Sequence, residues 1–454
     1  MSNEMRTENK MGIMPVRRLI LTMSTPMMFS MLVQALYNIV DSIFVSRIDE
    51  AALTAVTLAF PMQNFMIAVT GGTGVGINAL LSRSLGEKNY ERADQAACTG
   101  IILNIIHYLI FLFIGIFLAG PFIRTQSSDP LIIGYGETYL RIVCILSIGV
   151  FFQITMERLL QSTGRTFYSM LSQVTGVLIN LVMDPALIFG LGPFPALGVA
   201  GAAYATIFGQ IAASCLGVWL NVNKNDDIRL SVAKILHPDR QAAAEIYAVG
   251  IPSILMMSIG SVMTYAMNRI LIAFSSTATA VFGIYFKLQS FVFMPVFGLN
   301  NGVIPVLAYN FGAKSRERIR QTLVFSLELA LGIMIGGAAV FELFPAALLS
   351  LFAASDDMRA IGIPALRIIA LSFPVAGICI VLGSVFQAFS RSVFSLIVSI
   401  GRQLVALIPA AYLLAATGIL SNVWWAFPIA EIASLLLSVI FFRKVYHEMV
   451  EPIK

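Results

Sequence analysis

The chain has 454 residues, of which 58% are hydrophobic and 12% are charged, and its formal net charge is +5. Soluble domains carry roughly 25% charged residues, so this composition excludes an ordinary water-soluble protein. Apolar runs close to the roughly 20 residues that cross a bilayer recur along the whole length. The segment 323–344 is apolar on every face, which excludes the alternating pattern of a membrane β-barrel. The sequence therefore predicts an all-α integral membrane protein.

The apolar runs predict twelve transmembrane helices joined by short connections. In chain order these helices span 19–46, 52–81, 96–119, 138–160, 168–190, 198–221, 246–274, 280–309, 322–344, 364–389, 393–416 and 422–442. The longest connection, 221–245, is shorter than the roughly 50 residues of a small catalytic domain, so we expect no enzyme. The apolar stretch that follows the basic first segment is too long for a signal-peptide core, so we expect no cleavage.

Lys and Arg residues near helix ends favour the cytoplasmic side of a membrane. One set of loops carries only Arg47, Arg124 and Arg359. The other set carries Arg17, Arg18, Arg83, Lys88, Arg92, Arg165, Lys224, Arg229, Lys234, Arg240, Lys314, Arg316, Arg318, Arg320, Arg391, Arg443 and Lys444. This asymmetry predicts a multi-pass protein of the cell membrane with both termini in the cytoplasm. The positive net charge then reflects membrane topology rather than nucleic-acid binding.

The second half of the chain matches the first at a constant offset of 226 residues. Matched pairs include Pro26 and Pro252, Gln63 and Gln289, Gly72 and Gly298, Gly76 and Gly302, Gly86 and Gly312, and Arg165 and Arg391. Six is an even number of helices, so both halves begin on the same side of the membrane and form a parallel repeat. We expect two six-helix lobes, 1–221 and 246–454, joined by a cytoplasmic linker at 222–245. Such repeats favour a transporter that works by alternating access.

Two acidic residues fall deep inside predicted helices, where each costs at least about 2.5 kcal/mol to insert. In the first helix Gln34, Asn38 and Asp41 share one face, which we expect to point into the lobe. In the fifth helix Asn180 and Asp184 share a face. The carboxylates of Asp41 and Asp184 can therefore meet between the two helices. Such a pair disfavours double ionisation and can hold a proton, or it can coordinate sodium together with the Asn180 carbonyl. The structural alternative is that both acids only cap or cross-link helices.

The fourth helix carries a second polar stripe, Gln153, Glu157 and Gln161, which is a candidate for the wall of a central cleft. Glu157 there could attract a cationic substrate. The neighbouring Arg158 could equally hold Glu157 in a structural ion pair, and the sequence leaves both interpretations open.

Cleft candidates in the second half are Met256, Lys287 and Phe291, although lipid-facing packing is the commoner role for Met and Phe. Charge alone suggests that Lys287 pairs with Glu431. The four cysteines lie in apolar stretches without paired spacings, and the three histidines are far apart in sequence. No GxxxxGK[ST] motif occurs. We therefore expect no metal, no cofactor and no catalytic residues.

The sequence resembles the multidrug and toxic compound extrusion (MATE) family over essentially the whole chain. The most specific marks are Asn180, then Met183-Asp184-Pro185-Ala186-Leu187-Ile188-Phe189-Gly190, then Gly198-Val199-Ala200-Gly201-Ala202-Ala203. Gln161-Ser162-Thr163-Gly164 and Asn310-Phe311-Gly312-Ala313-Lys314 agree with this resemblance.

The resemblance implies two lobes around a V-shaped cavity and export of amphipathic, often cationic small molecules in exchange for protons or sodium. It also implies a cation-coupling site at Asp41, Asn180 and Asp184. Ala202 stands where some members offer a hydroxyl, which favours protons over sodium. The partners expected are small molecules, the coupling ion and membrane lipid, and we expect a monomer.

Three alternatives remain open from the sequence. The first is a lipid-linked saccharide flippase of the same superfamily, which Arg269 and Lys287 would suit. The others are a membrane enzyme, for which no catalytic constellation is visible, and a passive channel, for which no filter motif is visible.

Overall fold

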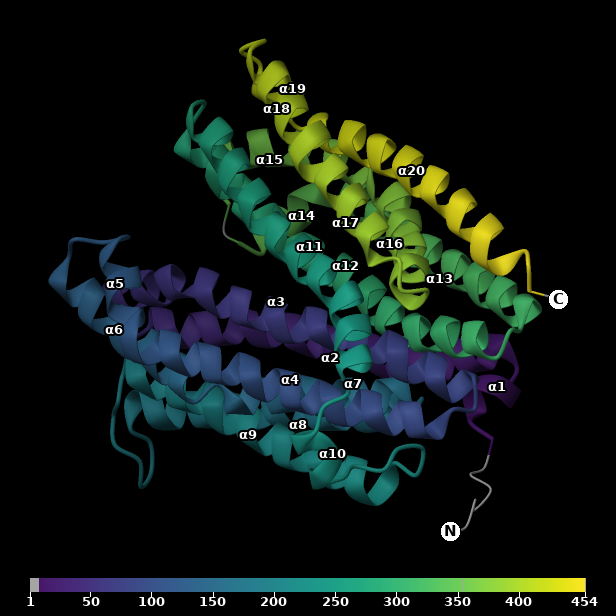
Figure 1. The fold of residues 1–454 in the computed structure, drawn as a ribbon. Helices are drawn as coiled ribbons and strands as arrows, with labels where there is room; N and C mark the ends of the chain where they lie inside the picture. The colour runs from purple at the N-terminus through teal and green to yellow at the C-terminus, as the bar shows by residue number, and fades with distance from the viewer. Residues whose placement is uncertain (1–7, 353, 454) are drawn as a thin grey trace.

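The computed structural model describes residues 8–352 and 354–453. The outer limits of the two predicted lobes, residues 1 and 454, lie outside these ranges. The described chain folds into two helical lobes that meet near the two termini and diverge at the opposite end (Figure 1). We call these the termini end and the far end. The integral-membrane, all-α prediction with two lobes is confirmed.

The first lobe contains α1 to α10. Its elements are α1 (Lys10–Ile13), α2 (Val16–Ser46), α3 (Glu50–Gly86), α4 (Tyr90–Phe117), α5 (Ala119–Arg124), α6 (Pro130–Ile145), α7 (Ile148–Ser162), α8 (Thr166–Phe189), α9 (Val199–Lys224) and α10 (Val232–Leu236). The connection from α9 to α11 passes through α10, inside the predicted linker.

The second lobe repeats the pattern. Its elements are α11 (Arg240–Ile272), α12 (Ser276–Gly312), α13 (Arg316–Leu343), α14 (Pro345–Ser350), α15 (Asp356–Ala370), α16 (Phe373–Ala388), α17 (Ser392–Ile400), the π-helix η1 (Gly401–Leu407), α18 (Ile408–Ala415), α19 (Leu420–Val423), α20 (Ala426–Val445) and the π-helix η2 (Tyr446–Val450).

In the described part of the chain, ten helices are long and apolar enough to cross a membrane, and counting each bent pair as one span gives twelve. The pairs are α6 with α7 and α15 with α16, and each is bent by 47°. The sequence predicted a single helix at each place, 138–160 and 364–389. At the two breaks the hydroxyls of Ser147 and Ser372 donate to the carbonyls of Cys144 and Ile369, at 2.7 and 2.6 Å. These hydroxyl groups bond to carbonyl groups in the last turns of α6 and α15, where a helix end leaves carbonyls without intrahelical partners.

The internal repeat extends to backbone conformation. Lys88 and Lys314 have φ angles of 57° and 53°, and Gly164 and Ser390 have φ angles of 85° and 60°. The two members of each pair are 226 positions apart, because 314 − 88 and 390 − 164 give the same value. Positive φ is uncommon for residues other than glycine, so its recurrence at matched positions supports the repeat that the sequence predicted.

Candidate functional site

Glycines let the two lobes approach closely at the termini end, where α3 meets both α11 and α12 and where α2 crosses α12. A Cβ atom on Gly86 would overlap the carbonyl oxygen of Tyr309, and one on Gly312 would overlap that of Arg83. These two contacts are related by the repeat, because the two glycines are 226 positions apart and so are the two residues that contribute the carbonyl oxygens. The lobes are therefore tightly closed on each other at this end.

A short N-terminal segment, residues 8–14, lies across this closed end and contacts both lobes. The Asn9 amide donates to the Thr163 carbonyl at 2.9 Å and to Asp227 Oδ1 at 3.1 Å in the first lobe. The Arg318 guanidinium of the second lobe donates to the carbonyls of Met11 and Met14, at 2.9 and 2.8 Å. We call this segment the strap.

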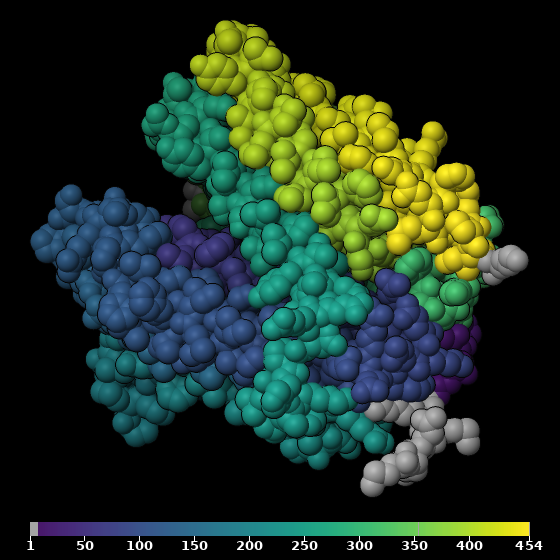
Figure 2. All heavy atoms as spheres, in the orientation of Figure 1, coloured from purple at the N-terminus to yellow at the C-terminus, as the bar shows by residue number. Residues whose placement is uncertain are grey.

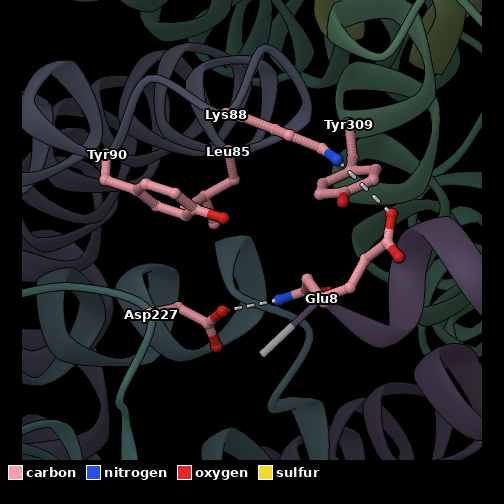
Figure 3. Close-up of a pocket in the computed structure, with 7 residues that line it drawn as sticks. Glu8, Leu85, Lys88, Tyr90, Asp227 and Tyr309 are labelled. Carbon is pink, nitrogen blue, oxygen red and sulfur yellow. Dashed lines mark hydrogen bonds and ion pairs between the residues drawn. The ribbon is translucent and has the colours of Figure 1, made fainter. Parts of the chain in front are cut away.

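A small cavity of about 90 Å³ lies under the strap, between the lobes (Figure 3). Glu8 reaches Lys88 across it at 3.8 Å, and Tyr309 of the second lobe forms part of its wall. Burial and the neighbouring Arg165 lower the pKa of Lys10, while Asp227 opposes this shift. The strap therefore adds polar interlobe contacts to the glycine crossings.

The far end is open. Figure 2 shows the molecule hollowed between the first lobe and the tip of the second lobe formed by α11. The interlobe glycine contacts lie in the termini-side halves of α2, α3, α11 and α12, so they leave the other halves free to diverge.

The predicted acidic pair comes together inside the first lobe. Asp41 of α2 and Asp184 of α8 lie within hydrogen-bonding distance of each other through their carboxyl groups. Asp184 is fully buried, whereas Asp41 keeps part of its surface exposed. Two ionised carboxylates only accept hydrogen bonds, so a hydrogen bond between them requires a shared proton.

Asn180 connects this pair to α9. With its amide oriented to suit its neighbours, Asn180 donates to Asp184 Oδ2 at 2.7 Å. Its carbonyl oxygen then accepts from the Tyr37 hydroxyl at 3.0 Å and from the Thr206 hydroxyl at 3.2 Å. The backbone N–H of Thr206 donates to the same oxygen at 3.0 Å. Three helices thus hold one polar cluster.

Sequence reasoning missed Tyr37 and Thr206. Tyr37 lies one turn before Asp41, and Thr206 lies one turn after Ala202, so helical spacing contained a signal for both. The predicted preference for protons relied partly on the missing hydroxyl at Ala202. That reason is wrong, because Thr206 supplies a hydroxyl to the site from the same helix.

The other polar residues of the predicted stripe on α2 contact each other. Gln34 donates to Asn38 Oδ1 at 3.3 Å, and Asn38 is exposed. Asp41 is the residue of this stripe that lies beside Asp184 of α8.

Glu157 and Arg158 of α7 point to different partners. Glu157 is buried and accepts a hydrogen bond from Gln153 at 2.9 Å. Arg158 donates to Gln161 at 2.8 Å and, across the interlobe boundary, to Asn301 at 3.1 Å. The hydrogen bonds of Arg158 therefore join the two lobes.

In the second lobe, Lys287 is exposed, and Met256 and Phe291 are partly exposed. Phe291 and Lys287 precede Gly298 by seven and eleven residues, so they share the face of α12 that meets α2 further along. The suggested pairing of Lys287 with Glu431 is wrong. Glu431 is buried and pairs with Arg402 of η1 at 3.0 Å.

Comparison with known proteins places this geometry among transporters. The chain is 27% identical to an FAD transporter of Shewanella oneidensis, over 88% of each chain. It is 26% identical to the multidrug export protein MepA of Staphylococcus haemolyticus, over 91% of this chain and 90% of that one.

Solved structures give the same result. One is an outward-facing multidrug resistance MATE transporter of the MOP superfamily, with a TM-score of 0.92, 25% identity, and coverage of 98% of this chain and 99% of that one. Another is a MATE protein in complex with MaL6, with the same TM-score and identity, covering 98% and 100%. The MatE family model matches residues 26–186 and 252–413, one segment in each lobe. The chain therefore belongs to the MatE family of membrane transporters and is not an enzyme.

Proposed function

We propose that this transporter exports amphipathic, often cationic small molecules from the cell in exchange for protons, by alternating access. The observation that carries this proposal is the carboxyl pair of Asp41 and Asp184, held inside one lobe of a molecule that is closed at one end and open at the other. With both termini in the cytoplasm, the open end faces outward, as in the outward-facing relative.

A proton suits this pair better than a sodium ion. A sodium ion needs several oxygen atoms around it in place of its water, and the Asn180 oxygen already accepts from Tyr37 and Thr206. A shared proton needs only the direct approach of the two carboxyl groups. Asp41, the partly exposed member, then receives the proton from the open end and passes it to the buried Asp184.

The proton also changes the force between α2 and α8. A shared proton draws the two carboxyl groups together, whereas two ionised carboxylates in a buried site repel each other. Because α2 crosses α12 at the closed end, a shift of α2 alters the contact between the lobes. Proton binding in one lobe thereby biases which end of the transporter is open.

The charge of the cleft supports a second candidate, export of an anionic dinucleotide such as FAD. Lys287 is exposed on the face of α12 that continues toward the cleft, and one relative is an FAD transporter. An ammonium group at this position favours a phosphate over an organic cation.

Transport into inverted membrane vesicles separates the two candidates. We expect a cationic dye to accumulate against its gradient when the vesicle interior is acidic, and FAD not to accumulate. Matched vesicles that carry Asp184→Asn provide the control for passive leak. Accumulation of FAD but not of the dye would reverse the assignment, and equal entry into both sets of vesicles would remove the transport proposal.

A further inference from the structure

The second lobe carries an open basic pocket at the termini end, where α12 passes into α13. Its volume is about 630 Å³, and it is lined by Ala313, Lys314, Ser315, Arg316, Glu317, Arg320 and Tyr446. Three cationic side chains and one carboxylate thus face one hollow. The pocket is far from the polar cluster at Asp41 and Asp184, so the proposed ion exchange does not use it.

The cationic side chains of this pocket are exposed, so an anionic ligand can reach them. Lys314, Arg316 and Arg320 are all exposed. Arg316 donates a hydrogen bond to the Glu451 carbonyl at 3.4 Å, which does not neutralise its charge. The one acid of the pocket, Glu317, accepts a hydrogen bond from Gln321 at 2.9 Å.

The internal repeat provides a comparison site within the same molecule. In the first lobe, Tyr90 occupies the position that corresponds to Arg316, and Asp94 occupies the position that corresponds to Arg320. Asp94 is buried and accepts from the backbone N–H of Arg229, because the connection between α9 and α11 covers this place. The first-lobe hollow beside Lys88 is the 90 Å³ cavity under the strap (Figure 3). The second lobe is therefore both more open and more basic at the same point of the fold.

The pocket lies at the ends of two candidate membrane spans. α13 begins at Arg316 and is a candidate membrane span, and the span that ends at Val450 brings Tyr446 to the same level. Tyr residues favour the boundary between hydrocarbon and water, and basic pockets beside transmembrane helices bind anionic headgroups.

We propose that this pocket binds the phosphate headgroup of an anionic phospholipid from the surrounding membrane. The Arg316 and Arg320 guanidinium groups, one helical turn apart, bind the phosphate oxygens, and Lys314 adds a third positive charge. Tyr446 packs beside the glycerol and upper acyl region. A zwitterionic headgroup carries an ammonium group beside its phosphate. This positive charge is repelled by the three cations of the pocket, so such a lipid binds less well.

The test is titration of the purified full chain in detergent with phosphatidylglycerol or phosphatidylcholine, with bound lipid counted by native mass spectrometry. We expect phosphatidylglycerol to be retained preferentially, and Arg316→Gln/Arg320→Gln to weaken its binding by about tenfold. The matched control is Lys224→Gln/Arg240→Gln, which removes two exposed cations of the same end outside the pocket. Equal weakening in both double variants would show that attraction is diffuse and would overturn the site.

Two further arms complete the experiment. Lys314→Asn keeps the left-handed backbone that Asn tolerates and should weaken phosphatidylglycerol binding even if the double variant folds poorly. Inorganic phosphate and chloride at equal ionic strength should displace the lipid equally. Selective displacement by inorganic phosphate would mean a site for a free anion and would contradict the lipid assignment, as would unchanged lipid binding in Lys314→Asn.

Discussion

Asp184 is the residue on which the transport proposal depends most. Its side chain is fully buried, and its carboxyl group lies beside the Asp41 carboxyl and accepts a hydrogen bond from the Asn180 amide. An ionised carboxylate in such a place is costly unless it is paired or protonated. In the proposed mechanism the Asp41 carboxyl, rather than a cation, is the neighbour with which Asp184 shares a proton.

Asp184→Asn and Asp41→Asn should each abolish driven export, because an amide keeps the shape of the carboxyl group but does not bind and release a proton. Expression and thermal stability should change little. Export of a cationic dye from cells that produce each variant checks this prediction, with membrane amounts measured by immunoblot. Wild-type export in either variant would remove that acid from the coupling site.

Thr206→Val should lower the export rate about fivefold, the effect expected when one hydrogen bond of about 1 kcal/mol to the Asn180 oxygen is lost. Thr206→Ser keeps the hydroxyl and should restore the rate. Initial rates in vesicles with matched protein content provide the measurement. A Val variant as fast as wild type would show that Thr206 only packs.

At the scale of elements, the closed end depends on crossings in which a glycine of one lobe touches the backbone of the other. Gly86→Ala should weaken this closure, because the new Cβ overlaps the Tyr309 carbonyl. Overpacking of this kind costs about 1–3 kcal/mol. Spin-label distances between Lys224→Cys and Arg443→Cys, in a background without the native cysteines, should lengthen at this end.

Gly283→Ala is the control for that crossing, because a Cβ there meets nothing within 4 Å. Gly312→Ala, the repeat mate of Gly86→Ala, should reproduce its effect. Distances that shift equally in the control and in both crossing variants would mean that the glycines do not set the closure.

The strap should loosen when Arg318 is replaced. Arg318→Gln removes hydrogen bonds to the carbonyls of Met11 and Met14, so amide hydrogens of residues 10–14 should exchange faster. Arg320→Gln, two residues further along α13 and outside the strap contacts, is the matched control. Equal exchange in the two variants would show that Arg318 does not hold the strap.

The sequence predicted most elements because long apolar runs and a constant repeat offset are strong signals in a membrane protein. It did not predict the bends near Ser147 and Ser372, because the apolar pattern continues through both breaks. The acid pair was predictable, since charge is rare in a bilayer. The Arg402 partner of Glu431 was not, because partners on different helices depend on tertiary packing.

At the scale of the whole molecule, the two lobes differ in their buried polar residues. The polar cluster of Asp41, Asn180 and Asp184 lies in the first lobe, whereas the matching positions of the second lobe are Met267, Ala406 and Ala410. The transport proposal therefore assigns the ion site to the first lobe and makes the second lobe the partner against which the first lobe moves.

The coupling ion is tested most directly in proteoliposomes that contain the purified chain and a cationic dye. An imposed pH gradient in sodium-free buffer should drive uphill movement of the dye, and collapse of the gradient should stop it. An imposed sodium gradient at uniform pH should drive none, and Asp184→Asn should be inactive under both. Uphill transport driven by sodium alone, and unaffected by the pH gradient, would contradict proton exchange at the Asp41–Asp184 pair.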